Sequence, residues 1–169
     1  QGIRHFIFYD DALTIGSKGL LAPMLEEVVN RGLDVTFHTP NGMHIRGINA
    51  ENAKLMRRAG FKTIRISLET VDVVRQKESG GKTTNEEFVE CCQYLHEAGF
   101  QPQEIGVYLL AGLPGQDRSE VEESVQFVIS NGAYPYLSEF TPIPGTPLFE
   151  EAKACTALDI ENEPLFQNN

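Results

Sequence analysis

The sequence predicts an α/β fold, a partial (β/α) barrel of the TIM type that contains about five strand–helix units with parallel strands. Apolar strand-like runs alternate with amphipathic helical segments at a spacing of about thirty residues, which is the length of one βαβ unit. No short glycine-rich phosphate turn follows the first strand, so a barrel is favoured over a doubly wound sheet. Because a complete barrel of eight units needs about 250 residues, a chain of 169 residues can hold only part of one.

The first unit starts with a strand over residues 4–10, whose aromatic and β-branched residues end in two aspartates, as a buried strand does where it reaches a polar rim. Residues 18–31 place apolar side chains at helical spacing, which predicts a helix that stops at Gly32. The second strand is expected over residues 33–39, and the Pro-Asn-Gly sequence at 40–42 ends it.

The middle of the chain repeats this order. Asn49 is a suitable N-cap for a helix over residues 50–59, which a glycine ends. A third strand is expected over residues 61–69. After a polar stretch, Thr84 is expected to cap a helix over residues 85–98, again followed by a glycine.

The last units follow the same pattern. An almost wholly apolar run predicts a fourth strand over residues 104–112, and residues 117–130 have valine and isoleucine on one helical face. A short fifth strand is expected over residues 135–140. We expect one domain over residues 4–157, followed by a polar tail over residues 158–169.

The composition narrows the classes of partner. A net charge of -10 would repel a phosphate backbone, so direct binding of nucleic acid is not expected. No run approaches the ~20 apolar residues that cross a bilayer, and no signal-peptide pattern begins the chain, so we expect no membrane partner and a cytoplasmic location. The three cysteines, two of them adjacent at Cys91 and Cys92, argue against a disulfide framework. The four histidines lack paired ligand spacing, so no metal site is expected from this chain.

In a parallel α/β layout the functional site lies at the carboxyl ends of the strands. Carboxylates, amides and hydroxyls recur at these ends without a basic cluster. The candidates are Asp10, Asp11, Thr39, Asn41, Gly42, Ser67, Glu69, Thr70, residues 112–116 and residues 141–146. Such a rim suits an amine, a hydroxyl-bearing ribose or a metal ion better than a bare phosphate.

Three motifs stand in a recognisable order and spacing: IRISLET at 64–70, LLAGLPGQ at 109–116 and FTPIPGTPL at 140–148. Together with the segment 49–60, which ends in Ala-Gly, they resemble the later strands of the radical S-adenosylmethionine (SAM) superfamily, and the resemblance covers nearly the whole chain. The sequence is most similar to the branch whose members often carry a cobalamin-binding domain, because Phe-Tyr-Asp-Asp at 8–11 stands where other branches have Gly-Gly-Glu.

The resemblance implies a partial (β/α)6 barrel of the TIM type. It also implies an enzyme that holds SAM on a [4Fe-4S] cluster, which three cysteines bind in a CxxxCxxC loop after the first barrel strand. It implies reductive cleavage of SAM to a 5′-deoxyadenosyl radical that abstracts hydrogen from a small-molecule substrate, or a methyl transfer or ring rearrangement that involves cobalamin. Cys91, Cys92 and Cys155 lack the spacing of that loop. We therefore expect the first strand and the cluster loop to lie upstream of Gln1, this fragment alone to be inactive, and its thiols to be structural.

The same resemblance implies which polar residues bind SAM. Asp10 and Asp11 would meet the amino group of the methionine part, although either could simply cap the following turn. Ser67 and Glu69 match the ribose motif, and the alternation of side chains along a strand puts both on one face. Asn41 is a further candidate for cofactor binding because it lies at the end of the second strand.

Further SAM contacts are implied at the last two strands. Leu110 and Gly112 match the segment that touches the adenine, and Gln116 stands where related sequences often have glutamate. Pro142 and Ile143 match a segment whose backbone reaches the adenine edge. The apolar residues in this set could equally be ordinary core residues.

Other interpretations stay open. The chain could be a non-catalytic barrel module that binds a small ligand or supports neighbouring domains, and a CxxxCxxC motif just before Gln1 would decide between the two. An ordinary barrel aldolase or isomerase would need a lysine or a His-carboxylate pair at the strand ends, and we find neither.

Residues 80–83 imitate the end of a phosphate-binding loop, but the earlier glycine and the preceding strand are missing. Four scattered arginines are expected on solvated faces: Arg46, Arg57, Arg58 and Arg75.

The first strand also predicts a partner. Residues 4–10 are apolar, without proline or an internal charge, and they would present an unpaired backbone edge. We expect two copies of the chain to associate through this strand.

Overall fold

The computed structural model describes residues 2–10, 12–16 and 19–167. Five strands form one sheet in chain order: β1 His5–Ile7, β2 Thr36–His38, β3 Phe61–Glu69, β4 Ile105–Ala111 and β5 Tyr134–Glu139. The helices are α1 Leu21–Asn30, α2 Ala50–Ala59, α3 Val73–Glu78, α4 Asn85–Glu97, α5 Arg118–Ser130 and α6 Pro147–Cys155, with 3-10 helices η1 Ile45–Gly47, η2 Pro102–Glu104 and η3 Pro164–Phe166. All four pairs of neighbouring strands are parallel, so the predicted α/β fold with parallel strands is confirmed.

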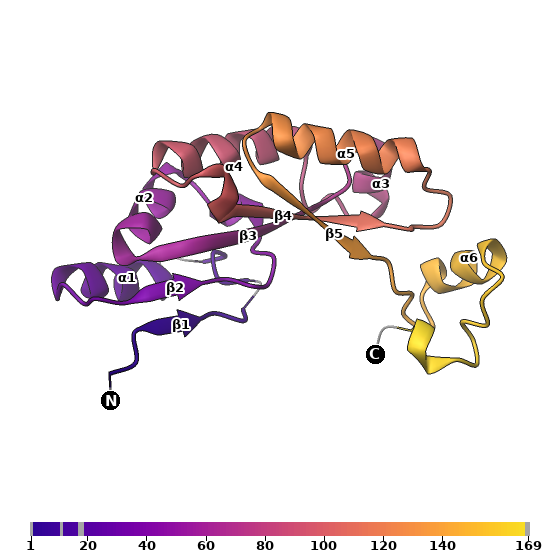
Figure 1. Ribbon diagram of the computed structural model, residues 1–169, viewed down its shortest axis with the longest axis horizontal. Helices are drawn as coiled ribbons and strands as arrows, with labels where there is room; N and C mark the ends of the chain where they lie inside the picture. The colour runs from indigo at the N-terminus through magenta and orange to yellow at the C-terminus, as the bar shows by residue number, and fades with distance from the viewer. Residues whose placement is uncertain (1, 11, 17–18, 168–169) are drawn as a thin grey trace.

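The helices α2, α4 and α5 lie along one face of the sheet (Figure 1). Alternate residues of the two central strands are buried, and they are Ile64, Ile66 and Leu68 of β3 and Ile105, Val107 and Leu109 of β4. The residues between them point to the other face, where Arg65 lies over the ring of Tyr136 at 4.7 Å and His38 Nδ1 is 2.9 Å from Thr63 Oγ1. The apolar core therefore lies between sheet and helices, whereas the opposite face of the sheet is polar and aromatic.

Local capping explains why several boundaries match the sequence prediction. The side chain of Asn49 accepts a hydrogen bond from the backbone of Asn52 at 2.9 Å, and Thr84 forms a capping box with Glu87. Gly60, with φ of 105°, ends α2 in the left-handed conformation, and a Cβ atom there would lie 2.3 Å from the carbonyl oxygen of Val35. These signals act within one turn of the helix, so the sequence alone reveals them.

The predicted elements near the N-terminus are too long. β1 has three residues instead of the seven expected, and β2 has only three as well. A strand keeps its conformation where a neighbour pairs with it, and β1 pairs only with the short β2. Helix α1 begins at Leu21 rather than at residue 18, which lies outside the described residues, and no side chain caps its start.

Two segments, one near the site and one near the C-terminus, differ from what the sequence predicted. Asp72 accepts a hydrogen bond from the backbone of Arg75 at 2.8 Å and so starts α3, which is too short to show helical periodicity in the sequence. In the segment expected to be a polar tail, Ile160 is buried and Lys153 pairs with Glu161 at 2.8 Å. The domain boundary at residue 157 stays a prediction.

None of the helices in the described ranges is long and apolar enough to cross a membrane.

Candidate functional site

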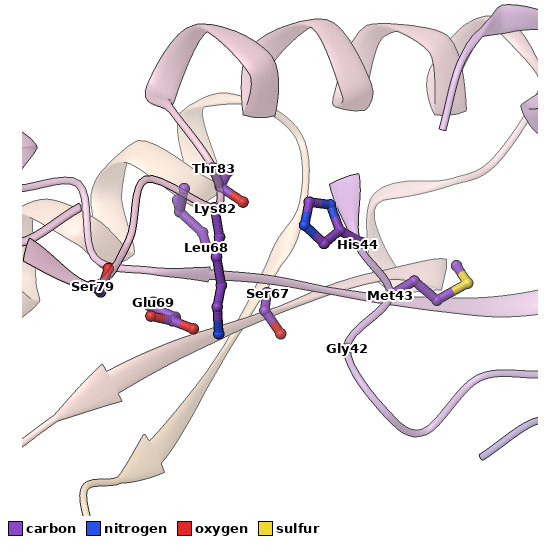
Figure 2. Close-up of a pocket in the computed structure, with 9 residues that line it drawn as sticks. All are labelled: Gly42, Met43, His44, Ser67, Leu68, Glu69, Ser79, Lys82 and Thr83. Carbon is purple, nitrogen blue, oxygen red and sulfur yellow. The ribbon is translucent and has the colours of Figure 1, made fainter. Parts of the chain in front are cut away.

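A cavity of ≈ 210 Å³ lies at the carboxyl end of β3 (Figure 2). Three segments that are distant in the sequence line it, and their residues are Gly42, Met43 and His44, then Ser67, Leu68 and Glu69, then Ser79, Lys82 and Thr83. The cavity is therefore made where the loop after β2, the end of β3 and the stretch after α3 meet. This is the edge of a parallel sheet at which ligands bind in barrel folds.

The loop after β2 reaches the cavity because it continues to pair with β3. The backbone of Met43 donates a hydrogen bond to the carbonyl oxygen of Arg65 at 2.8 Å, and Met43 forms a parallel bridge with Ile66. The loop passes so close that a Cβ atom on Gly42 would lie 1.9 Å from Ser67 Oγ. Glycine is needed at position 42 for this close approach rather than for an unusual backbone angle.

Ser67 and Glu69 both line the cavity, as their alternation along β3 led us to expect. The pairing of β3 with β4 shifts between these two residues, and Glu69 is the one non-glycine residue in the described ranges with a positive φ, 69°. Such a conformation costs on the order of 1–3 kcal/mol and is typical of functional sites. Within the described chain, no hydrogen bond or ion pair engages the Glu69 carboxylate, so its oxygens are available to a ligand.

Lys82 is the residue of this cavity that the sequence analysis missed. It belongs to the glycine-containing stretch that we had compared only with a phosphate-binding loop. Figure 2 shows its ammonium directed toward the same end of the cavity as the Ser67 hydroxyl and the Glu69 carboxylate. No carboxylate of the described residues lies within 4.0 Å of it. No local signal distinguished this lysine, because only the crossover between α3 and α4 brings it to β3.

Asp10, expected to bind SAM at the end of the first strand, does not line the cavity. Asp10 accepts a hydrogen bond from the backbone of Ala12 at 2.9 Å, so it caps the following turn. Asp11 lies outside the described residues. The side-chain amide of Asn41 donates to the carbonyl oxygen of Tyr9 at 2.9 Å and ties the loops after β1 and β2 together. Neither Asp10 nor Asn41 lines the cavity.

Gln116 organises the loop after β4. Its Oε1 accepts hydrogen bonds from the backbone of Gly112 at 2.8 Å and of Leu113 at 3.2 Å, and its Nε2 donates to the carbonyl oxygen of Leu110 at 3.2 Å. The structure thus brings together three of the residues expected to bind SAM. They hold the loop in shape, and they do not line the cavity beside Ser67.

The segment after β5 is also separate from that cavity. Pro142 is buried, whereas Ile143 is 53% exposed. The backbone of Phe140 donates to the carbonyl oxygen of Ala111 at 2.9 Å, which extends the contact between β4 and β5 to the carboxyl edge. Pro142 and Ile143 therefore lie at the same edge of the sheet as the other candidates, on its last strand.

Two of the arginines expected on solvated faces instead form partly buried ion pairs with glutamates. Arg75 pairs with Glu120 at 3.0 Å, with only 23% and 17% of the two side chains exposed, and it also donates to the carbonyl oxygen of Pro114. Thr70 donates to the same glutamate at 3.1 Å. Arg57 pairs with Glu104 at 2.9 Å. The prediction was wrong here because partners 45 and 47 residues away in the chain cannot be seen from local charge patterns.

The cysteines do not fit an iron–sulfur cluster. Cys91 and Cys92 are buried in α4, and burial raises the pKa of the Cys92 thiol to about 12 and that of Cys91 well above its ordinary value. Cys155 is exposed at the end of α6, contrary to the expectation that all three thiols are structural. No group of three or more histidine, cysteine or acidic side chains in the described ranges is placed to hold a metal ion.

Parallel strands in chain order, helices on one face and a polar cavity at the carboxyl edge define the α/β fold of a partial barrel, with a cavity at the edge where barrel folds bind ligands. Within this class, a scan against protein families matches the Radical SAM superfamily over residues 2–128, and the chain belongs to that superfamily. A search of curated proteins gives no match.

Solved structures of radical SAM enzymes share the fold. Coproporphyrinogen III oxidase (HemN) from Escherichia coli, described as a radical SAM enzyme, is 14% identical with a TM-score of 0.60, over 83% of this chain and 32% of that one. The radical SAM methyltransferase TsrM from Kitasatospora setae, solved with tryptophan and a SAM analogue, is 16% identical with a TM-score of 0.69, over 85% and 28%. Methylornithine synthase (PylB) is 18% identical with a TM-score of 0.57, over 79% and 38%. This chain therefore spans about a third of the length of the structures it matches.

Proposed function

We propose that this chain is the SAM-binding barrel portion of a radical SAM enzyme that acts on a small-molecule substrate. The observation that carries the proposal is the cavity at the end of β3, where a hydroxyl, a carboxylate and an ammonium line one space. SAM presents a ribose diol and an amino acid group, so it offers a complementary partner to each of these three groups.

Each of the three side chains has a distinct task in this proposal. The Glu69 carboxylate accepts hydrogen bonds from the two ribose hydroxyls, and its strained backbone holds it at the cavity rather than along the strand. The Ser67 hydroxyl, against which Gly42 packs, takes part in the same contact. The Lys82 ammonium pairs with the carboxylate of the methionine part.

The remaining candidates extend this site along the carboxyl edge of the sheet. Asp10 and Asp11 are proposed to bind the amino group of SAM; only one oxygen of Asp10 is used by the turn that it caps. For the adenine we propose backbone contacts from the loops after β4 and β5, at Leu110, Gly112, Pro142 and Ile143. Gln116 and Asn41 then act by fixing the loops that carry these contacts.

In the whole enzyme, a [4Fe-4S] cluster would supply one electron to SAM, which would release methionine and a 5′-deoxyadenosyl radical to abstract hydrogen from substrate; cobalamin-linked methyl transfer is the alternative outcome. The thiols of the described residues do not fit a [4Fe-4S] cluster, so we assign no step at a cluster to them. What this chain's own residues contribute is binding and orientation of SAM. We also propose that the enzyme is cytoplasmic.

Calorimetric titration with SAM tests the proposal. The wild-type chain should bind SAM weakly, and Glu69→Gln should weaken binding at least about tenfold, because a neutral amide accepts hydrogen bonds less strongly than a carboxylate. Glu123→Gln, an exposed glutamate of α5, is the matched control and should bind as the wild type does. Absence of SAM binding by the wild-type chain, at concentrations up to millimolar, would favour the non-catalytic module. Equal affinity of the Glu69 variant would remove that residue from the site.

A further inference from the structure

His44 is a cavity residue whose backbone is fixed, while its side chain makes no hydrogen bond with the described residues. Its carbonyl oxygen accepts hydrogen bonds from Thr14 Oγ1 at 3.0 Å and from the backbone of Gly47 at 3.2 Å. The preceding residue, Met43, is paired with β3. Backbone contacts on both sides of His44 therefore fix the loop after β2 and hold the imidazole at the cavity. The ring nitrogens are not needed to fix this loop.

The two ring nitrogens lie in different surroundings. Nδ1 is buried and has no hydrogen-bond partner among the described residues. Figure 2 shows the other nitrogen, Nε2, on the side of the ring that faces the cavity and Lys82. No hydrogen bond within the described chain uses Nε2 either, and this nitrogen is not buried, so a molecule in the cavity can reach it.

This arrangement determines where the proton of the neutral ring resides. A buried N–H group without an acceptor costs more than a buried lone pair without a donor, so the proton is favoured on Nε2. The charged groups around the ring are Lys82 and Glu69 in the cavity, and Arg46 with Glu87, which pair at 2.7 Å beside it. The hydrogen bond from Arg46 is the first cause that lowers the pKa of Glu87, and the nearby His44 is a smaller cause.

We propose that His44 binds SAM by donating a hydrogen bond from Nε2–H to the carboxylate of its methionine part. This proposal rests on the proposed function. The Lys82 ammonium lies in the same cavity. The Nε2–H group of His44 and this ammonium would each contact one oxygen of the same carboxylate. A ring without a donor, such as phenylalanine, would fill the same space and leave one of these oxygens without a hydrogen bond.

Three variants and two ligands test the proposal by calorimetry. His44→Phe should weaken SAM binding about tenfold, whereas His44→Gln, whose side-chain amide can place an N–H near the position of Nε2, should stay within about threefold of the wild type. 5′-Methylthioadenosine keeps the adenine and ribose but has no carboxylate, so its affinity should be the same for the wild type and both variants. His96→Phe, on a different part of the chain, is the control for removal of a histidine and should bind both ligands normally.

A long-range proton–nitrogen NMR spectrum of the histidine rings gives a second readout that does not depend on a variant folding. It should show a proton on Nε2 of His44, and the Nε2 signal should shift when SAM is added. A ring that carries its only proton on Nδ1, or an equal loss of affinity for both ligands in His44→Phe, would overturn the proposal. If the wild type binds 5′-methylthioadenosine and SAM, and all variants bind as it does, the role of His44 fails while the proposed function stands. If the wild type binds neither, the proposed function fails and this assignment fails with it.

Discussion

The centre of the sheet and its first edge are built from similar apolar strands, but the two have very different surroundings. Ile64 and Ile66 of β3 are fully buried, whereas Phe6 and Ile7 of β1 are 41% and 55% exposed. β3 has a strand on each side, while β1 pairs with β2 alone over three residues. The comparison shows that the number of neighbours, and not the apolar character of a strand, decides how much surface it buries.

The same difference explains where the cavity can form. Ser67 and Glu69 stand on a long strand that is held on both sides, so the strained backbone of Glu69 is supported by its surroundings. Asp10 stands after a short strand at the edge, where its side chain is used to make a turn. A rigid strand end can hold a ligand-binding group in place, whereas an edge strand has to stabilise its own loop first.

The largest expected difference between the two regions is in core truncation. Ile66→Ala should lower the free energy of unfolding by about 3 kcal/mol, because it leaves a cavity under the helices. Ile7→Ala, the same change at the exposed edge, should cost less than about 1 kcal/mol. Urea unfolding of both variants measures this. Equal losses would mean that β1 is as well covered as β3.

Close packing at the centre should make Gly42 intolerant of a methyl group. Gly42→Ala would place a Cβ atom 1.9 Å from Ser67 Oγ, so the loop has to move at a cost of about 1–3 kcal/mol. Gly19→Ala, near the edge, meets its nearest neighbour, the Gly16 carbonyl oxygen, at an ordinary 3.4 Å and should be nearly neutral. Thermal unfolding of the two variants, with SAM titration, provides the comparison. A Gly42 variant that is as stable as the wild type and keeps its affinity would contradict the close approach.

The thiols of the helical layer should make stability fall at high pH. Burial raises the pKa of Cys92 to about 12 in the folded chain, while the unfolded thiol titrates near 9.0, so the unfolded state loses its proton first. The stability that the neutral buried thiol contributes is therefore fully present below about pH 9 and is lost progressively as the pH rises from 9 towards 12. At pH 10 the free energy of unfolding is lower by about 1.4 kcal/mol because of this thiol. Unfolding of the wild type and of Cys92→Ala at pH 8 and pH 10 should show a smaller pH effect in the variant.

The exposed Cys155 should react with a thiol reagent in the folded chain, whereas Cys91 and Cys92 should react only after unfolding.

The exposed edge itself should give the smallest effect, in self-association. We propose that two copies pair through β1, whose residues His5–Ile7 are all exposed. Ile7→Lys puts a charge on this edge and should weaken any dimer at least about fivefold without changing the fold. Phe8 is a poor site for this test because its ring stacks on Phe61 at 5.9 Å and packs against the core. Light scattering over a range of concentrations is the measurement, and a strictly monomeric wild type would rule out the edge contact.

The sequence by itself determined the features that depend on neighbouring residues. Asn49 and Thr84 cap helices where expected, and the bounds of β3 and α2 follow from the apolar pattern between glycines. The motifs of β3 and β4 indicated the superfamily, and the alternation along β3 placed Ser67 and Glu69 on one face. Each of these signals is read within a few residues along the chain.

Only the tertiary structure decided which residues share the cavity. Lys82 and His44 come from separate crossovers and meet β3 because the strands lie in chain order, which no local pattern encodes. The burial of Arg75 with Glu120, the turn that Asp10 caps and the exposure of Cys155 likewise depend on contacts made after the chain has folded. Caps and periodicity are short-range interactions along one element, whereas a binding site at the edge of a parallel sheet is assembled from the ends of several elements, so its membership depends on how they pack together.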